Sequence, residues 1–173
     1  MAKKEPISLA MNTRVLFVCM GNICRSPMAE GVFRQMVRQA GLEDVVKVSS
    51  AGTHGFHAGE APDKRAQAVT AKRGVDISGL RARSVLEKDF DEHDLILAMD
   101  WDNLSALQQL APKRAHHKLQ LLMRFATEHE TATIADPYYG NAQGFEPVLD
   151  CIEDACAGLL ELAKRRATQV AAA

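Results

Sequence analysis

Short apolar runs recur along the chain and predict its strands. Four of them, at residues 14–19, 45–52, 94–99 and 117–123, are continuous or nearly so. Runs of this length without regular polar alternation are typical of strands that are buried on both faces of a sheet. The sequence therefore predicts four buried strands.

The segments between and after these runs carry apolar residues at helical spacing, with polar residues on the opposite side. They predict four helices, from Pro27 to just before Gly41 and at residues 62–73, 101–110 and 145–166. Gly41 stands where a glycine commonly ends a helix. Strands and helices thus follow one another in alternation from the first strand to the last helix.

This alternation determines the expected fold class. A β-α-β-α order favours a parallel sheet, because each helix returns the chain so that the next strand runs in the same direction. We expect an α/β fold in which a four-stranded parallel sheet has helices on both faces. Residues 13–168 are expected to form a single domain, preceded by a disordered extension at 1–12 and followed by a loose tail at 169–173.

Composition narrows the classes of function. Hydrophobic residues make up 47% of the 173 residues and the net charge is -1, so no basic surface points to nucleic acid or an anionic membrane. No segment has the roughly 18 consecutive apolar residues of a membrane span, so we expect no membrane insertion. Four cysteines, at 19, 24, 151 and 156, are too few for a disulfide scaffold and are expected to be free thiols in the cytoplasm.

The segment VCMGNICRSPMAE, residues 18–30, follows the first predicted strand and opens the first predicted helix. In parallel sheets, ligands bind beyond the carboxyl ends of the strands. Cys19 and Cys24 do not have the C-x2-C spacing of a metal site, and no second ligand pair accompanies them. Neither glycine-rich nucleotide-binding motif occurs here. A redox pair stays open, although thioredoxin-type chemistry uses two intervening residues.

An anion-binding loop is consistent with every position of this segment. A loop that leads into a helix N-terminus presents free N–H groups and the positive end of the helix dipole. Gly21 and Asn22 are the residue types that best tolerate positive φ angles, which would turn these amides inward. Arg25 can bind two oxygens of a phosphoryl group with its planar guanidinium.

The same loop supplies a nucleophile, and a later segment supplies an acid. Cys19 lies at the base of the loop, where a thiolate could attack a bound phosphoryl group, and Ser26 could donate a hydrogen bond to it. A leaving oxygen needs a proton. Asp136 in DPYYGN, just beyond the fourth strand, is the strongest candidate for its donor, although Asp-Pro is also a common turn. Tyr138 and Tyr139 could form aromatic walls beside it.

These motifs closely resemble those of the low-molecular-weight protein tyrosine phosphatases. The matching segments, in family order from about residue 13 to the last helix, are VLFVCMGNICRSP, SSAGT at 49–53, APDKR at 61–65, DLILAMD at 94–100 and DPYYGN at 136–141. A C-x5-R motif alone is weak, but its combination with a distal DPYYG is highly specific. The resemblance implies a flavodoxin-like three-layer sandwich and a hydrolysis that needs no metal and no cofactor.

The resemblance also implies a role for each matching residue. Cys19 would form a cysteinyl-phosphate, Arg25 would stabilise the phosphoryl oxygens, and Asp136 would protonate the tyrosyl oxygen and then activate water. The phosphate-binding loop would comprise Met20, Gly21, Asn22, Ile23, Cys24, Arg25 and Ser26. The implied substrate is a phosphotyrosine-containing protein or peptide, with inorganic phosphate as product and a cognate tyrosine kinase as a partner.

Further residues match supporting positions of the family. Ser50 corresponds to a hydrogen-bonding residue behind the loop, and Phe56 and Tyr138 correspond to aromatic residues at the pocket rim. Cys24 corresponds to a cysteine that forms a reversible disulfide with the nucleophile, with an inert loop residue as the alternative. Gly79 stands where animal members carry a histidine that helps to hold the loop asparagine. The sequence leaves open how Asn22 is held.

Two other activities occur on the same fold. An arsenate reductase would need an additional cysteine pair near the third strand, and residues 60–100 contain no cysteine. Protein arginine phosphatases tend to carry threonine at the position of Ile23 and lack the double tyrosine. An apolar Ile23 cannot hydrogen-bond a guanidinium group or a water molecule. The resemblance therefore favours a tyrosine phosphatase, with an arginine phosphatase as the nearest alternative.

Overall fold

The computed structural model describes residues 12–172 of the 173-residue chain, and the side chains up to residue 169. Almost all of the disordered extension expected at residues 1–12 therefore lies outside the described residues. The boundaries of the expected domain stay a prediction.

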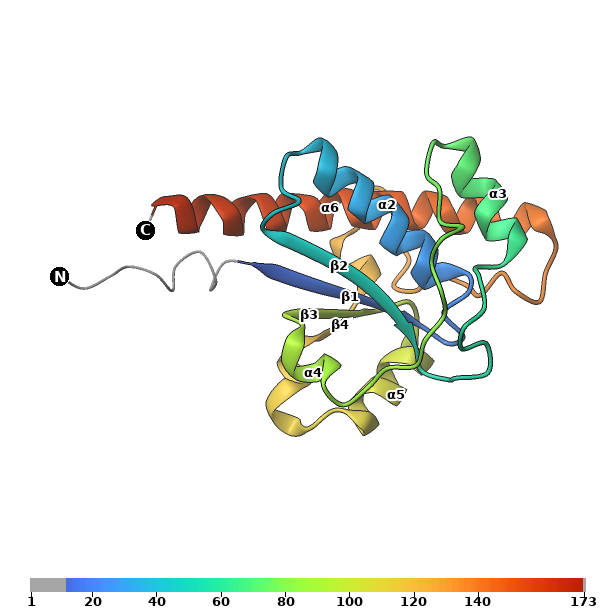
Figure 1. Cartoon of the computed structure of the whole chain (residues 1–173), viewed down its shortest axis with the longest axis horizontal. Coiled ribbons are helices and arrows are strands. Elements are labelled where there is room, and N and C mark those ends of the chain that lie inside the picture. Colours follow the sequence, from blue (N-terminus) through green and yellow to red (C-terminus); the bar gives the residue numbers. More distant parts are fainter. Residues whose placement is uncertain (1–11, 173) are drawn as a thin grey trace.

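The described residues form one four-stranded sheet in the order β2-β1-β3-β4. All its neighbouring strands are parallel: β1 pairs with β2 and β3, and β3 pairs with β4. The strands are β1 (Thr13–Cys19), β2 (Val46–Gly52), β3 (Leu95–Ala98) and β4 (Leu119–Leu121). The predicted parallel α/β fold is confirmed (Figure 1).

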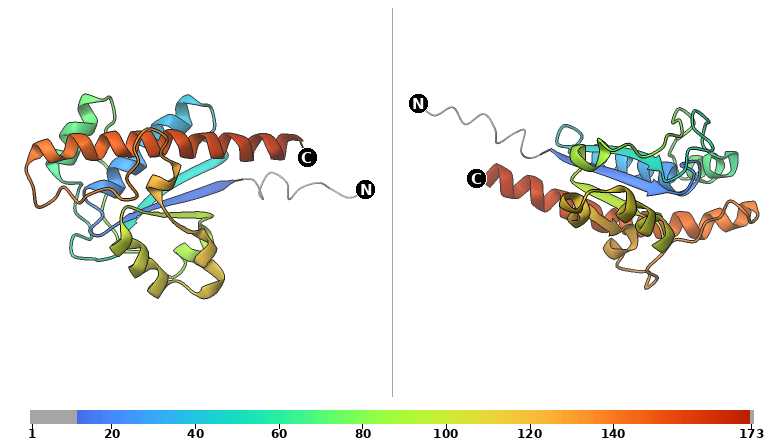
Figure 2. Two further views of the ribbon diagram at one scale, coloured as in Figure 1. Left: turned by 180° about the vertical axis from the view of Figure 1, so that it is seen from behind. Right: turned by 90° about the horizontal axis from the view of Figure 1, so that it is seen from below.

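Helices cover both faces of this sheet (Figures 1 and 2). On one face lie α2 (Arg25–Gln39), α3 (Lys64–Lys72) and α6 (Phe145–Ala172), and on the other lie α4 (Asp89–Glu92) and α5 (Trp101–Leu110). Short 3-10 turns occur at Lys113–Lys118, Leu122–Phe125 and Ala142–Gly144. This arrangement confirms the flavodoxin-like sandwich.

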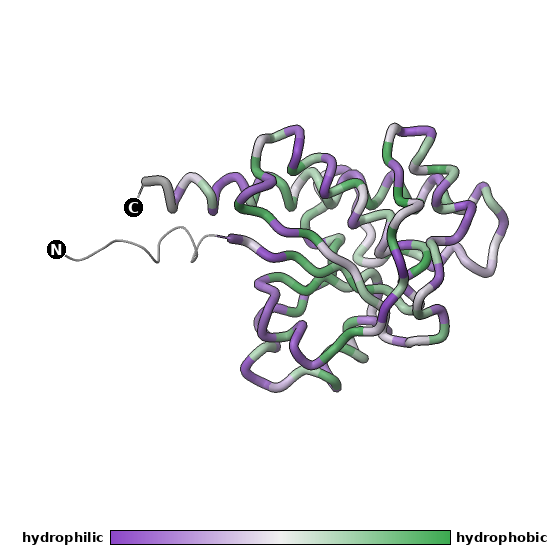
Figure 3. The backbone as a smooth tube through the Cα atoms, in the orientation of Figure 1, coloured by the Kyte–Doolittle hydropathy of each residue, from purple (hydrophilic) through white to green (hydrophobic). Residues whose placement is uncertain are grey.

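The central strand β1 shows why the strand sequences are apolar without alternation. Val15 and Phe17 pack into the core cluster under α2 and α6, whereas Leu16 and Val18 pack into the cluster beneath α5. Successive side chains of a strand point to opposite faces, so a central strand with a core on each side needs apolar residues throughout. The hydropathy colouring shows that β1 is apolar along most of its length (Figure 3).

Some predicted boundaries were wrong. The fourth strand was expected at 117–123, but β4 ends at Leu121 and a 3-10 turn follows. Leu122 and Met123 are both buried in the same core cluster, and two consecutive strand residues cannot point to one face. The last helix continues to Ala172, beyond its expected end at residue 166, because its alanines are strong helix formers. The short helix α4 was not predicted.

Candidate active site

The phosphate-binding loop runs from the end of β1 into the first turn of α2, which begins at Arg25. Asn22 has a φ of 58° and is the one non-glycine residue with positive φ in the described chain. Gly21 was expected to share this conformation, and that expectation was wrong. A Cβ atom at Gly21 would instead lie 3.1 Å from Cδ2 of His57, so glycine here leaves room for that ring.

Cys19 lies at the base of the loop, with only 3% of its surface exposed. The Oγ atom of Ser26 lies 3.0 Å from its Sγ atom, and the backbone N–H of Asn22 donates to Sγ at 3.3 Å. The sulfur of Cys19 therefore lies within hydrogen-bond distance of two groups of the loop that it begins.

Asn22 is held by hydrogen bonds on every side. Its Nδ2 atom donates to Ser26 Oγ at 2.7 Å and to Ser50 Oγ at 2.9 Å, and its Oδ1 atom accepts from the backbone N–H of Arg83 at 3.0 Å. Ser50 in turn donates to Glu30 on α2. These contacts hold the loop asparagine without a histidine at the position of Gly79.

Arg25 is 98% buried and is oriented by the residues that surround it. Its Nη1 atom donates to Asp100 Oδ2 at 2.6 Å and to the carbonyl oxygen of Ile134 at 2.8 Å. Its Nη2 atom lies 3.5 Å from Asp136 Oδ2. Asp100 also caps α5 by accepting from the backbone N–H of Asn103, so the two loops that follow β1 and β3 are connected through one guanidinium.

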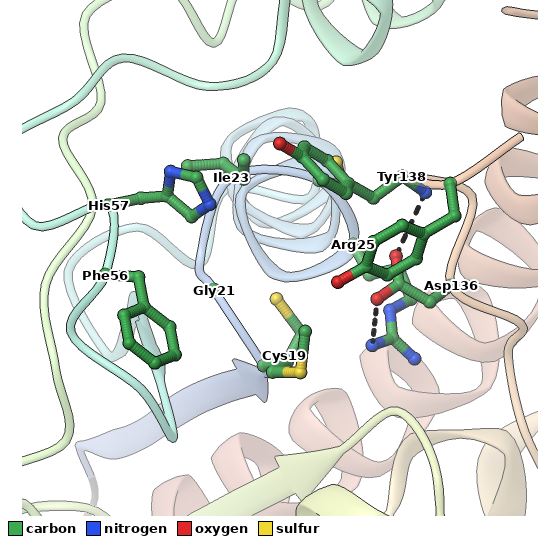
Figure 4. Close-up of a pocket in the computed structure, with 11 residues that line it drawn as sticks. Cys19, Gly21, Ile23, Arg25, Phe56, His57, Asp136 and Tyr138 are labelled. Carbon is green, nitrogen blue, oxygen red and sulfur yellow. Dashed lines mark hydrogen bonds and ion pairs between the residues drawn. The ribbon is translucent and has the colours of Figure 1, made fainter. Parts of the chain in front are cut away.

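A pocket of about 240 Å³ brings the predicted catalytic residues together. Cys19, Arg25 and Asp136 line it, and aromatic side chains form its rim (Figure 4). The complete lining is Cys19, Met20, Gly21, Ile23, Cys24, Arg25, Phe56, His57, Asp136, Tyr138 and Tyr139. Asn22, Ser26 and Ser50 do not line the pocket, and they support the loop from behind.

The rim is aromatic on two opposite sides. Phe56 and His57 lie on one side and Tyr138 lies beside Asp136 on the other (Figure 4). Phe56 is 81% exposed and Tyr139 is 78% exposed, so neither contributes to the core. Exposed aromatic rings around a concave site are suited to hold a planar aromatic ligand.

Cys24 lines the same pocket but differs from Cys19 in its surroundings. Burial, with a further contribution from the nearby carboxylate of Asp63, raises the pKa of the Cys24 thiol well above its usual range. This side chain is therefore a protonated thiol at neutral pH. All four cysteines are free in this structure.

Several contributors to the site were missed in the sequence. Glu30, His57 and Arg83 were not assigned to the site, because their contacts join segments far apart in the chain. Asp100 caps α5, and its ion pair with Arg25 was not predicted. Its place directly after a strand, at the edge where ligands bind, was the available signal.

Between residues 12 and 172 no group of three or more His, Cys, Asp or Glu side chains is arranged to hold a metal ion. None of the helices described there is long and apolar enough to cross a membrane.

Comparison with known proteins places the chain in a family. The family model described as low molecular weight phosphotyrosine protein phosphatase matches residues 14–170. A low molecular weight protein-tyrosine-phosphatase of Streptomyces coelicolor is 46% identical over 153 residues, which are 87% of this chain and 93% of the relative.

Solved structures have the same fold. A protein tyrosine phosphatase from Entamoeba histolytica with Hepes in its active site superimposes with a TM-score of 0.85 at 37% identity, over 88% of this chain and 97% of the other. A Drosophila arginine phosphatase superimposes with a TM-score of 0.80 at 34% identity, over 87% and 97% of the two chains. The extent of the family match, together with the shared fold, shows that this chain belongs to the low molecular weight phosphotyrosine protein phosphatases.

Proposed function

We propose that the protein is a tyrosine phosphatase that hydrolyses phosphotyrosine in proteins or peptides through a cysteinyl-phosphate. One observation carries this proposal: Cys19, Arg25 and Asp136 line one pocket with an aromatic rim. Inorganic phosphate is the product, and a cognate tyrosine kinase would supply the substrate. The cytoplasm is the expected location.

In the first step, the Cys19 thiolate attacks phosphorus, and the bond from phosphorus to the tyrosyl oxygen breaks. Asp136 transfers its proton to that oxygen, so that a neutral phenol leaves. Arg25 and the N–H groups of the loop from Met20 to Ser26 stabilise the charge on the equatorial oxygens. The positions of Cys19, Arg25 and Asp136 in the lining of one pocket support this assignment.

In the second step, Asp136 acts as a base. It takes a proton from a water molecule, whose oxygen attacks the cysteinyl-phosphate, and the sulfur leaves as a thiolate. The backbone N–H of Asn22, which donates to Cys19 Sγ, stabilises this leaving group as well as the nucleophile. Neither step requires a metal ion.

The remaining loop and rim residues have supporting roles. Asn22, Ser26 and Ser50 fix the loop conformation through their shared hydrogen bonds. Phe56 and Tyr138 hold the phenyl ring, with Tyr139 at the outer edge. Cys24 forms a disulfide with Cys19 under oxidation and so protects the nucleophile from irreversible oxidation.

An arginine phosphatase is the second candidate, since a structural neighbour from Drosophila has that name. The side chain of Ile23 lines the pocket and has no group that could hydrogen-bond a guanidinium. The double tyrosine supplies aromatic surface instead. Both features support phosphotyrosine rather than phosphoarginine as the substrate.

The test compares phosphotyrosine and phosphoarginine peptides with the wild-type enzyme and three variants, in the presence of EDTA. Cys19→Ser should abolish hydrolysis, and Asp136→Ala should lose rate chiefly with poor leaving groups. Cys151→Ser, far from the pocket, is the matched control and should keep full activity. Activity that depends on an added metal, or a preference for phosphoarginine, would contradict the proposal.

A further inference from the structure

Arg65, near the start of α3, connects its helix to the segment that carries Asp136. Its Nη2 atom donates to the carbonyl oxygen of Tyr138 at 3.0 Å, and its Nη1 atom donates to that of Gly140 at 2.9 Å. The guanidinium also lies 4.7 Å from the ring centroid of Phe145, at the start of α6. One side chain thus contacts the acid-bearing loop, defined here as residues 136–141, at two carbonyl groups.

The other side of this guanidinium is fixed by Asp63. The Nε and Nη2 atoms of Arg65 donate to the two carboxylate oxygens of Asp63 at 3.0 and 2.8 Å. Asp63 caps α3 by accepting from the backbone N–H of Arg65, and its own backbone N–H donates to the carbonyl oxygen of Ile23 at 2.8 Å. A continuous path of hydrogen bonds therefore runs from the phosphate-binding loop to the acid-bearing loop.

Few other polar contacts from distant segments hold the acid-bearing loop. Within residues 12–172, its remaining hydrogen bonds are local. Tyr138 N–H donates to Asp136, Gly140 N–H donates to Pro137, and Asn141 accepts from the backbone N–H groups of Gln143 and Gly144. Apart from Arg65, the one polar contact from a distant segment of the described chain is the 3.5 Å ion pair between Arg25 and Asp136, which a bound phosphoryl group would compete for. Arg65 therefore supplies the polar contacts that do not involve the reacting groups.

We propose that Arg65 is a positioning residue, which holds Asp136 at the correct place above the phosphate-binding loop. This inference rests on the proposed function, because it assumes that Asp136 is the acid. A lysine could not replace this arginine, since a single ammonium group cannot bind a carboxylate with two parallel hydrogen bonds and also reach two separate carbonyl groups. Misplacement of a catalytic group by about 1 Å can cost about 100-fold in rate.

The test measures kcat/KM for a series of aryl phosphates that extends from p-nitrophenyl phosphate, a good leaving group, to phenyl phosphate, a poor one. Rates are expressed per vanadate-binding site, so that unfolded protein does not contribute. Arg65→Gln and Arg65→Lys should each lose about 10- to 100-fold with the poor leaving group and less than about threefold with the good one. Vanadate affinity should stay within about twofold, because the phosphate-binding loop is unchanged.

Arg73→Gln is the matched control. Arg73 follows the end of the same helix, and its guanidinium pairs with Glu146, Asp150 and Glu153 of α6 without contact to the acid-bearing loop. This variant should show the wild-type dependence on leaving group. An equal loss with every substrate in the Arg65 variants, no loss, or the same leaving-group dependence in Arg73→Gln would overturn the inference.

A parallel measurement on Asp136→Ala separates this inference from the proposed function. If Asp136→Ala steepens the dependence on leaving group and the Arg65 variants do not, Arg65 has no positioning role and the proposed function stands. If Cys19→Ser keeps its activity, or if Asp136→Ala loses rate equally with all leaving groups, the proposed function itself fails.

Discussion

Asp100 and Arg25 form an ion pair at the back of the substrate pocket, with Oδ2 of the aspartate 2.6 Å from Nη1 of the arginine. The arginine is almost fully buried, and the aspartate caps a helix on the opposite face of the sheet. The guanidinium is therefore oriented before a phosphoryl group arrives. Orientation of a binding group in advance lowers the entropy cost of reaching the transition state.

Removal of the Asp100 charge should therefore impair catalysis. Asp100→Asn weakens the charge-assisted hydrogen bond that fixes Arg25, and we expect kcat/KM for aryl phosphates to fall about 10- to 100-fold. Steady-state kinetics and inorganic phosphate inhibition would measure this. Asp102→Asn, an exposed residue of the same helix turn, is the control. Equal activity of the two variants would contradict the role given to Asp100.

Asn22 combines an unusual backbone conformation with a set of side-chain hydrogen bonds, and two substitutions separate these properties. Asn22→Gly keeps access to positive φ but removes the side-chain contacts, whereas Asn22→Ala also adds about 1–2 kcal/mol of backbone strain. We expect both to weaken vanadate binding, with the alanine variant the less stable to urea. If Asn22→Gly binds vanadate as wild type does, the hydrogen bonds do not shape the loop.

Cys24 should determine how well the enzyme recovers from oxidation. Cys19 is oxidised by peroxide to a sulfenic acid, which a nearby thiol converts to a disulfide with loss of water. Without that thiol, further oxidation to the irreversible sulfinic acid competes. We expect Cys24→Ser to regain clearly less activity than wild type when dithiothreitol follows a peroxide pulse. Cys151→Ser serves as control, and recovery of Cys24→Ser equal to that control would assign Cys24 an inert role.

Asp154 on α6 should make the free energy of unfolding depend on pH in the acidic range. It accepts hydrogen bonds from the backbone N–H groups of Thr127, Glu128 and His129 and from the His129 ring, and its side chain is 5% exposed. Burial alone would raise its pKa, but these hydrogen bonds outweigh burial and lower the pKa of Asp154 from 3.8 to about 2. The folded protein therefore favours the charged carboxylate more than the unfolded chain does.

The sign of the effect follows from that difference. Because the folded-state pKa lies below the unfolded-state value, the stabilisation is complete above about pH 4 and is lost as the pH falls towards 2. After allowance for solvent screening, we expect about 1 kcal/mol. Urea unfolding of Asp154→Asn should show this loss at pH 6 and a smaller one at pH 2.5, whereas Asp44→Asn, at an exposed position outside the helices, should match wild type at both. A difference that does not change with pH would exclude the charge as its source.

The parts of the structure that could be predicted from sequence are those that a short segment determines. The run from Val15 to Val18 predicted a strand with a core on both sides, and the strand does pack that way. Strict alternation of elements then predicted the parallel sheet. Cys19, Arg25 and Asp136 could be assigned because their residue types and spacing match one chemistry, and the fold brings them to one pocket.

The parts that were missed depend on contacts between distant segments. Glu30 on α2 accepts a hydrogen bond from Ser50, and the backbone N–H of Arg83 donates to Asn22. Neither contact could be predicted from a local pattern. Arg65 lay within a matching motif, but its contacts with Tyr138 and Gly140 become visible only in three dimensions. The positive φ expected at Gly21 was wrong because glycine there serves a different purpose, the close approach of His57.

The ion pair between Arg25 and Asp100 has a consequence for stability as well as catalysis. It joins the loop that leads to α2 on one face of the sheet with the loop that leads to α5 on the other. An oxyanion that binds to Arg25 therefore binds only when both faces of the sheet are folded. Its binding energy adds to the free energy of unfolding of the whole domain. At a ligand concentration of 100 times Kd the gain is about 2.7 kcal/mol. Occupancy of the pocket and global folding are thus a single linked equilibrium.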